Sequence, residues 1–219
     1  MIMLIGGIKG GVGKTTIATN LAVWLSGHGV DFALIDADHQ RSSANWAERR
    51  ADSPAQTVFC PEKLGQGLYP FLVDIESRVG TVIVDAGGRD SVELRQALLA
   101  ADVLYSPLAP SQLDIETLDE LVETVRVAQA MNPALVTRLL LSQVETSRGA
   151  DELRDARETL AEIAGEHPVL GMSEIIIPRR KVYRQAIREG LGVLEMNNPL
   201  ARAEMEALAQ EIFGDVVQP

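Results

Sequence analysis

A glycine-rich segment near the amino terminus constrains this chain more than any other feature. Residues 9–16 read Lys-Gly-Gly-Val-Gly-Lys-Thr-Thr, between a short apolar run at residues 2–5 and a stretch with helical apolar spacing at residues 17–25. A strand, a glycine loop and a helix in this order are typical of a phosphate-binding loop, because free N–H groups at the helix start point toward an anion. We therefore predict a phosphate site in residues 9–16, called the P-loop below. A glycine turn with chance lysines is the weaker alternative.

Each residue type in the P-loop suits the binding of a nucleotide phosphate. The glycines have no Cβ, which lets the backbone curl around an anion. Lys14 supplies positive charge to the β- and γ-phosphates, and the Thr15 hydroxyl is placed to bind Mg²⁺. The nucleotide-binding residues predicted in this loop are Lys9, Gly10, Gly11, Val12, Gly13, Lys14, Thr15 and Thr16.

Apolar strand-like runs alternate with helical patterns along the whole chain, and this alternation predicts the fold class. The class is α/β, a doubly wound and mostly parallel sheet flanked by helices. Strands are expected at residues 1–6, 32–36, 57–59, 81–85, 103–106, 137–141 and 174–177. Helices are expected at residues 14–26, 42–50, 65–76, 91–100, 115–131, 151–164, 180–189 and 199–213. The length of 219 residues suits one P-loop domain over residues 1–215, with a flexible tail at residues 216–219.

Three aspartates lie where predicted strands end. Asp36 and Asp38 alternate at the end of one strand, and Asp85 ends another in the Walker B arrangement. Ligands of such sheets bind at the carboxyl ends of the strands. We therefore predict that Asp85 holds Mg²⁺ through water, together with Thr15. A helix cap is the alternative for any one of these aspartates.

The P-loop resembles the deviant Walker A box of the ParA/MinD family of ATPases. Ile8 stands where the common spacing has glycine, and Lys9 follows one residue later. In that family the first lysine reaches across a face-to-face dimer to the phosphates bound by the partner chain. The resemblance implies that ATP and Mg²⁺ join two subunits with the help of Lys9, and that hydrolysis separates them. A solvated loop residue is the alternative for Lys9.

The resemblance also implies catalytic roles. The second aspartate of the family's Asp-x-Asp segment orients the attacking water, and this position is Asp38. The resemblance places Asp36 nearer the magnesium, so Asp36 joins Thr15 and Asp85 as a predicted metal-binding residue. Phosphoryl transfer needs in-line positioning and charge neutralisation more than covalent chemistry, so Lys9 and Lys14 complete the predicted catalytic set. His39 stands where the family usually has proline, and we expect it to be a solvated loop residue.

Further matches extend the resemblance over most of the chain. Residues 43–46 resemble the helix that follows the Asp-x-Asp segment in the compact, ParF-like partition ATPases. Residues 102–111, followed by Asp114, look like the strand and loop after Walker B. Pro178 and Arg179 lie in a late segment that resembles the one flanking adenine, so both join the nucleotide-binding candidates.

Basic residues gather late in the chain, although 20 Lys and Arg against 31 Asp and Glu give a net charge of −11. Arg180, Arg184 and Arg188 are spaced four apart and are expected to form one ridge of a helix. Arg179 and Lys181 adjoin them, and in sequence only Glu189 opposes the cluster. The resemblance implies non-specific DNA binding through these five residues. Pairing with the protein's own carboxylates and contact with nucleotide stay open as alternatives.

Composition excludes several function classes. Cys60 is the only cysteine, which excludes an internal disulfide and the paired-cysteine cluster of iron-protein relatives and favours a reducing cytoplasm. No run approaches the roughly 18 apolar residues that span a bilayer. Residues 201–215 are amphipathic, but their polar face is acidic. Anionic lipid would repel that face, so we expect this segment to pack on the domain.

Together these patterns and the resemblance imply a ParA-like ATPase that forms an ATP-dependent sandwich dimer and binds DNA without regard to sequence. It would position a plasmid, a chromosome or a protein cargo in the cytoplasm, associated with the nucleoid. A ParB-like cargo adaptor would stimulate its slow hydrolysis, with the helix at residues 115–131 as a candidate partner surface. The alternatives are a MinD-like membrane-associated positioning ATPase and a metabolic ATP-dependent enzyme on the same scaffold.

Overall fold

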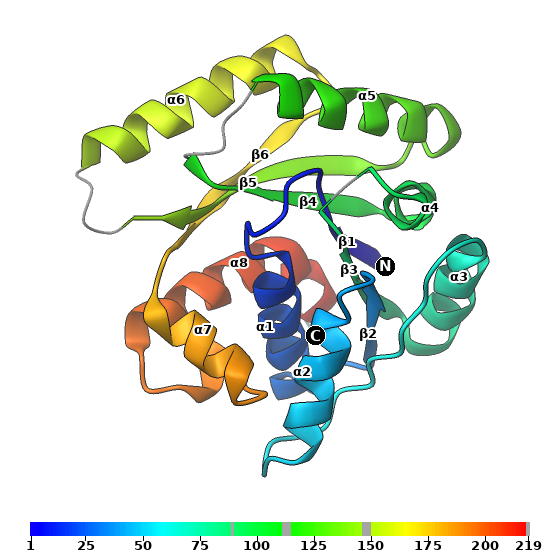
Figure 1. Cartoon of the computed structure of the whole chain (residues 1–219), viewed down its shortest axis with the longest axis vertical. Helices are drawn as coiled ribbons and strands as arrows, with labels where there is room; N and C mark the ends of the chain where they lie inside the picture. Colours follow the sequence, from blue (N-terminus) through cyan, green and yellow to red (C-terminus); the bar gives the residue numbers. More distant parts are fainter. Residues whose placement is uncertain (89, 111–114, 146–149, 218–219) are drawn as a thin grey trace.

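A six-stranded parallel sheet forms the centre of the molecule (Figure 1). The computed structural model describes residues 1–88, 90–110, 115–145 and 150–217. The strands run in the order β2-β3-β1-β4-β5-β6, and each neighbouring pair is parallel. Their bounds are β1 (Ile2–Ile5), β2 (Phe32–Ala37), β3 (Thr81–Ala86), β4 (Val103–Leu108), β5 (Val136–Val144) and β6 (Gly171–Pro178). The predicted fold class is confirmed.

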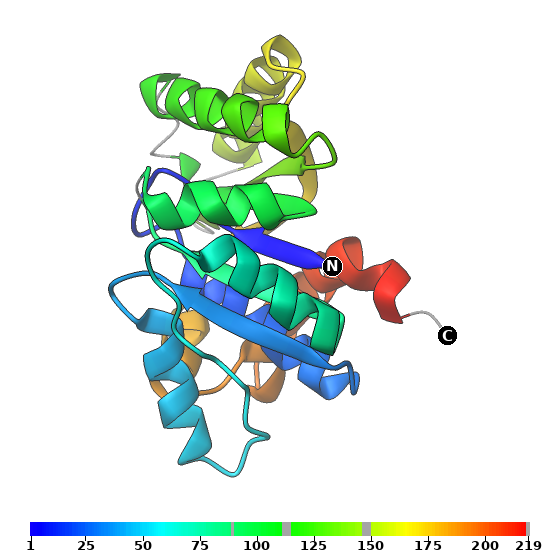
Figure 2. The same cartoon turned by 90° about the vertical axis from the view of Figure 1, so that its right-hand side faces the viewer.

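Helices cover both faces of this sheet (Figures 1 and 2). One face is covered by α1 (Lys14–Gly27), α2 (Ser42–Ala51), α7 (Lys181–Arg188) and α8 (Pro199–Val217), with a short 3₁₀ turn, η2 (Val193–Glu195). The other face is covered by α3 (Leu68–Val79), α4 (Val92–Ala100), α5 (Ile115–Met131) and α6 (Ala150–Glu166). The structure is therefore a three-layer sandwich, as a doubly wound sheet requires.

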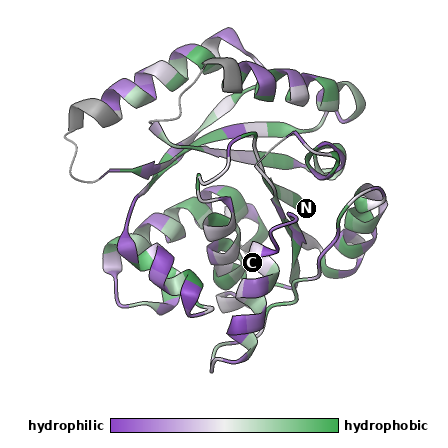
Figure 3. Ribbon diagram, in the orientation of Figure 1, coloured by the Kyte–Doolittle hydropathy of each residue, from purple (hydrophilic) through white to green (hydrophobic). Residues whose placement is uncertain are grey.

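The apolar core divides into two clusters, one on each face of the sheet. In β1 the side chains of Ile2 and Leu4 belong to the first cluster, and those of Met3 and Ile5 belong to the second. This division follows from the strand geometry, since successive side chains point to opposite faces. Because helices bury both faces, the strands read as nearly continuous apolar runs. Figure 3 shows apolar residues along the strands and polar residues on the outer sides of the helices.

The strand predicted at residues 57–59 is wrong. Residues 57–61 run beside β2. The carbonyls of Phe59 and Pro61 accept hydrogen bonds from the N–H groups of Leu34 and Asp36 in β2, both at 3.1 Å. The only bridge here, between Asp36 and Glu62, is isolated. Proline has no N–H to donate, so Pro61 prevents a regular ladder from forming.

Several predicted helix boundaries also differ from the structure. Gly67 adopts a left-handed conformation (φ 94°) that is not helical, so α3 begins at Leu68 and not at residue 65. Arg180 is extended (φ −120°) and precedes α7. At the carboxyl end α8 continues to Val217, past the predicted helix end at residue 213, while residues 218 and 219 lie outside the described residues. Residues 111 and 114, which match the family's loop after Walker B, also lie outside the described residues.

The last helix packs on the domain, as predicted. Ala201, Met205, Leu208 and Phe213 of α8 are buried in the same cluster as α1. Across the four described ranges, we find no helix with both the length and the apolar character needed to cross a membrane.

The topology opens a crevice at the carboxyl ends of two adjacent strands. The P-loop leaves β1 toward α1 on one face, whereas the loop after the neighbouring β3 leads to α4 on the other face. Adjacent strands whose connections leave to opposite faces create the switch point at which such sheets bind ligands. The candidate site lies at this point.

Candidate functional site

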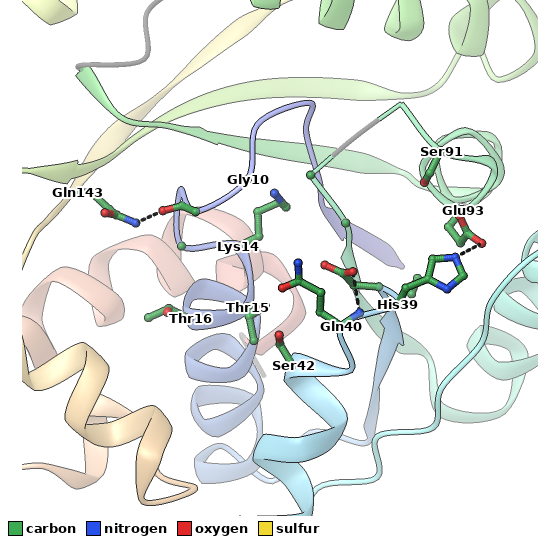
Figure 4. A pocket seen from close by; sticks show the side chains of 16 residues that line it. Gly10, Lys14, Thr15, Thr16, His39, Gln40, Ser42, Ser91, Glu93 and Gln143 are labelled. Atoms are coloured by element: carbon green, nitrogen blue, oxygen red, sulfur yellow. Dashed lines mark hydrogen bonds and ion pairs between the residues drawn. The ribbon is translucent and has the colours of Figure 1, made fainter.

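A cavity of about 720 Å³ opens at the carboxyl ends of β1, β2 and β3 (Figure 4). Residues 10–16 of the P-loop form one side of it, Val12 excepted. The loop after β2, which carries Asp38, and the loop after β3, which carries Gly87 and Gly88, form much of the rest, and Gln143 of β5 and Glu93 of α4 also line it. Its size suits a nucleotide, because ligand sites commonly measure roughly 300–1,000 Å³.

The end of β5 holds the P-loop in shape. The Ser142 hydroxyl donates a hydrogen bond to the Val12 carbonyl at 2.9 Å, and the Gln143 side-chain amide donates to the Gly11 carbonyl. Gly13 caps α1 in a left-handed conformation (φ 92°), which a residue with a Cβ rarely adopts. Sequence reasoning missed Ser142 and Gln143, because nothing in the sequence shows that they meet a loop 130 residues away.

Lys14 is a buried cation with a single neutral partner. Its side chain lies in the cavity wall, and the residue is only 7% exposed. The ammonium donates a hydrogen bond to the Lys9 carbonyl at 2.6 Å and forms no ion pair with any described residue. Burial lowers the pKa of Lys14, and the charges of Asp85 and Asp38 oppose this effect. An ammonium has three donors, so Lys14 is free to offer the others to an anion.

The Lys9 side chain behaves differently. It is half-buried and is not part of the cavity wall. Within the described ranges its ammonium forms no hydrogen bond or ion pair, although its carbonyl holds Lys14. The two lysines of the P-loop therefore have different environments: one is fixed in its own cavity, and the other is available to a neighbouring molecule.

Asp85 is buried behind Thr15, which lines the cavity. One of its oxygens accepts hydrogen bonds from the Thr15 and Ser43 hydroxyls, both at 2.7 Å. Burial raises the pKa of Asp85 to about 7, although these hydrogen bonds oppose the shift. Sequence reasoning gave Ser43 no such role, because a serine at a helix start reads as an ordinary capping residue.

The residues around Asp85 fit a magnesium ion that is held together with a nucleotide. Hydroxyl and carboxylate oxygens are the ligands that Mg²⁺ prefers, and Thr15 and Asp85 bring both together. The described residues contain no group of three or more His, Cys, Asp or Glu side chains that could hold an ion alone. Mg²⁺ usually takes only one or two protein ligands beside substrate phosphates and water, so this sparse set suits it.

Asp36, the other aspartate predicted to bind metal, holds the backbone of the loop after β2. It is fully buried, it does not line the cavity, and its two oxygens accept hydrogen bonds from backbone N–H groups. The donors are Asp38 at 3.0 Å and Ala44 at 2.8 Å. Burial raises the pKa of Asp36, and these backbone bonds oppose the rise. Asp36 therefore fixes the loop after β2 to the start of α2.

Asp38 lines the cavity, and the loop after β3 packs closely against it. A Cβ on Gly87 would lie 3.3 Å from the Asp38 carboxyl carbon. A Cβ on Gly88 would lie 2.6 Å from the Lys9 carbonyl oxygen, too close for any side chain. His39, next to Asp38, is exposed as predicted, and its Nε2 lies 3.6 Å from Oε1 of Glu93 (Figure 4). Close approach therefore explains the two glycines after β3.

A second, smaller cavity of about 110 Å³ lies on the other side of the P-loop. It shares Gly13, Thr16 and Gln143 with the first cavity. Pro178 and Arg179 line it, so the structure brings these two sequence-predicted residues next to the P-loop.

Two of the five cations predicted to bind DNA pair with carboxylates of the chain, which is one of the alternatives left open for this cluster. Arg179 forms an ion pair with Glu145 at 2.7 Å. Arg180 precedes α7, and its Nε lies 2.9 and 3.0 Å from the two oxygens of Glu204. These carboxylates come from the segment after β5 and from α8, so the sequence around residue 180 could not show them.

The other three cations lie on the exposed side of α7. Lys181, Arg184 and Arg188 are exposed and form no ion pair with the described part of the chain. Arg49 of α2 joins them, since its guanidinium donates to the Ile187 carbonyl at 3.3 Å. These four residues are called the α7 basic strip below. Arg49 was missed in the sequence because it lies more than 130 residues away from α7.

Comparisons with known proteins agree with this geometry. Residues 3–193 match the model of the CobQ/CobB/MinD/ParA nucleotide binding domain. A curated relative from Gloeobacter kilaueensis, the maintenance of carboxysome distribution protein A, is 34% identical over 94% of this chain and 91% of its own length. The protein of the same name from Halothiobacillus neapolitanus is 31% identical over 89% of this chain and 87% of its own length.

A solved structure shows the same fold. A putative plasmid partition protein from Borrelia burgdorferi, bound to AMPPNP, superposes with a TM-score of 0.71. The match covers 98% of each chain at 21% identity. At this identity the match shows a shared fold only.

Proposed function

The chain belongs to the CobQ/CobB/MinD/ParA nucleotide-binding domain family, and we propose that it is a ParA-like ATPase that positions an intracellular cargo. In this proposal two copies close face to face over two ATP molecules, and hydrolysis separates them. A cargo adaptor stimulates the hydrolysis. The support comes from the site geometry together with the family.

The observation that carries the proposal is the contrast between the two P-loop lysines. Lys14 is fixed in its own cavity by a backbone carbonyl and keeps its positive charge available for phosphate. The Lys9 ammonium has no partner among the described residues, although it belongs to the same loop. A lysine that serves the nucleotide of a second copy should be free in a single chain, and Lys9 is.

The site residues divide the work of phosphoryl transfer. Backbone N–H groups of the P-loop and Lys14 hold the phosphates and offset the charge that develops on them. Thr15 and Asp85 would hold Mg²⁺, which supplies further positive charge when bound. Pro178 and Arg179 lie where the adenosine end of the nucleotide would extend, beside the second cavity.

Asp38 is the residue that we assign to the attacking water. It lines the cavity from the loop after β2, and a backbone bond from Gln40 at 3.0 Å holds one of its oxygens. The other oxygen accepts no hydrogen bond from the described residues and can orient water for in-line attack. Asp36 supports this placement, because its own oxygen accepts the N–H of Asp38.

Two relatives suggest the class of cargo. The curated proteins at 34% and 31% identity are both named for maintaining carboxysome distribution. We therefore propose a large protein assembly as the cargo, with plasmid or chromosome partition as the less supported choice. The nucleoid would provide the track, and the α7 basic strip would contact its phosphates without reading sequence.

The proposal is tested by binding and turnover measured on the same preparation. Calorimetry should detect ATP binding that Mg²⁺ strengthens, and Asp38→Ala should bind ATP with similar affinity. Hydrolysis by that variant should fall by roughly 10² or more. Turnover of Asp38→Ala at the rate of the parent would remove Asp38 from the mechanism. An absence of ATP binding by the parent chain would refute the proposed function as a whole.

DNA binding forms a separate arm of the test. The parent chain should retain DNA with ATP or a slowly hydrolysed analogue, and release it with ADP. Because each phosphate contact contributes about −0.9 to the slope of log affinity against log salt, two salt concentrations report how many contacts form. Equal retention with ADP and ATP would contradict nucleotide control of the strip.

A further inference from the structure

An apolar groove between α4 and α5 has no part in the nucleotide site. Its volume is about 460 Å³, and its floor is aliphatic, with Leu99 from α4 and Val127, Ala128 and Met131 from α5. Val127 is 61% exposed and Met131 is 78% exposed. Figure 2 shows these two helices side by side on one face of the sheet. Exposed apolar side chains gathered in one hollow mark an interaction site.

The rim of this groove carries negative charge that the described residues do not neutralise. Glu120 and Glu123 line the groove, are exposed, and form no ion pair with the described residues. Arg95 also lines it, but the Asp90 carboxylate binds its guanidinium, with Nε to Oδ1 at 2.7 Å. The described rim therefore offers two free carboxylates and no free cation, which selects for a basic partner.

We propose that the α4–α5 groove binds an amphipathic helical segment of a partner protein. The apolar stripe of that segment lies on Leu99, Val127 and Met131, and its basic side chains lie beside Glu120 and Glu123. The proposal rests on the proposed function, in which a cargo adaptor must contact this chain. A small metabolite fits poorly, because the floor has no converging polar groups to orient it. A second copy would bring the same two carboxylates and repel.

Helix α4 connects this groove to the nucleotide cavity. Ser91 and Glu93, at its amino-terminal end, line the cavity, and Leu99 lies two turns further along at the groove. The Glu93 carboxylate also accepts the N–H of Gly65 at 2.8 Å, which ties the loop before α3 to the same point. A segment bound in the groove thus contacts the helix that borders the nucleotide. Any coupling between the two must be reciprocal in binding free energy.

The test uses a synthetic helical peptide of about 18 residues, or roughly five turns. It carries leucine along one face, lysine on the flanks and a fluorescent label. A matched peptide carries glutamate in place of each lysine. Binding to the full chain is followed by fluorescence anisotropy without nucleotide, so a chain that fails to bind ATP would refute the proposed function and leave this test intact. The lysine peptide should bind, and the glutamate peptide should not.

Variants locate the binding on the groove. Val127→Glu and Met131→Glu, each tested alone, should lower the affinity for the lysine peptide by about tenfold or more, because each places a charge on the apolar floor. Leu200→Glu on α8 is the matched control, since Leu200 is 62% exposed and lies on the opposite face. Its affinity should equal that of the parent, which separates the groove from the general attraction of an acidic chain for a basic peptide.

Two further results would overturn the proposal. One is equal affinity of the parent and Val127→Glu for the lysine peptide. The other is a change of oligomeric state in Val127→Glu without nucleotide, measured by sedimentation, because it would make a second copy the occupant.

Glu120→Gln combined with Glu123→Gln should weaken binding by only about threefold at low salt, since exposed ion pairs contribute little. Loss of that difference at high salt is the expected pattern.

Discussion

The P-loop and the start of α7 both gather positive charge, but their cations have different partners. Lys14 is buried, and its ammonium bonds only to the neutral carbonyl of Lys9 among the described residues. Arg180 is also partly buried, yet the Glu204 carboxylate neutralises it, and Glu145 does the same for Arg179. An anion site is therefore marked by cations that lack a carboxylate partner. The number of cations in a segment does not mark it.

The exposed α7 basic strip stands between these two cases. Like Lys14, its members lack a carboxylate partner among the described residues, but water surrounds Lys181, Arg184 and Arg188. Each of these cations therefore contributes much less to the binding free energy of a single ligand than a cation in a low-dielectric cavity does. A strip of this kind needs many phosphates along a polymer to bind well, and salt should weaken it strongly.

Lys14→Ala should have the largest effect on this comparison. Loss of the buried ammonium removes charge-assisted hydrogen bonds to phosphate, so ATP affinity should fall by roughly 10² or more. Calorimetry with ATP and Mg²⁺ measures it, and Lys181→Ala serves as the control with unchanged affinity. If both lysines mattered equally for ATP, burial would not be the distinction that we describe.

Reversing the charge of the α7 basic strip should have the next largest effect. Lys181→Glu, Arg184→Glu and Arg188→Glu together should abolish DNA retention in ATP while ATP binding stays intact. The salt slope of the parent should be steeper than that of a single Arg188→Ala variant by about 0.9 for each chain that contacts DNA, because each chain of that variant can neutralise one phosphate fewer. Gel shifts at two salt concentrations measure this. A triple variant that binds DNA like the parent would place the DNA-binding surface elsewhere.

Arg180→Ala should affect stability and leave DNA binding nearly unchanged. Removing the guanidinium leaves the largely buried Glu204 with the Tyr183 hydroxyl but without its cationic partner. This loss should cost about 2 kcal/mol of the free energy of unfolding. Arg184→Ala is the matched control, and it should stay within about 0.5 kcal/mol because its site is exposed. Urea unfolding measures both. The opposite ranking would mean that Arg184, and not Arg180, is the structural residue.

The pH dependence of stability gives a separate test, at the buried end of the comparison. Burial raises the pKa of Asp85 to about 7 in the folded chain, while the unfolded value is ordinary, at about 3.9. The folded chain therefore holds a proton that the unfolded chain has lost between these values. The free energy of unfolding should fall as pH rises from about 4 to about 7 and lose no more above that.

Asp85→Asn isolates this contribution. The amide cannot ionise, so the variant should show a shallower fall over the same pH window, with part of the slope left to Asp36, whose pKa burial also raises. Denaturant unfolding with EDTA and without nucleotide keeps metal and ligand effects out. An unchanged slope in Asp85→Asn would show that Asp85 is not the group that titrates.

The sequence alone was enough for the features that depend on neighbouring residues. The P-loop works through consecutive backbone groups, so its eight residues predict both its shape and its ligand. The buried strands are visible in the sequence as apolar runs, and α5 has the predicted bounds, Ile115–Met131. The expected strand at residues 57–59 failed for a local reason as well, because Pro61 cannot donate to a ladder.

Features that depend on contacts through space could not be predicted in this way. Ser142 holds the P-loop from another strand, and Glu204 reaches Arg180 from α8. No local pattern indicates either contact. Asp36 shows the same limit, since an aspartate at a strand end can bind metal or cap backbone groups, and only its surroundings decide.

The most direct test of the central claim is the molar mass of the chain with ATP and Mg²⁺, measured by light scattering. The Asp38→Ala variant, which should not hydrolyse ATP, is expected to have twice the mass of one 23.7 kDa chain. Adding Lys9→Ala to it should return the mass to that of one chain while ATP still binds. A dimer that persists without the Lys9 ammonium would contradict the account.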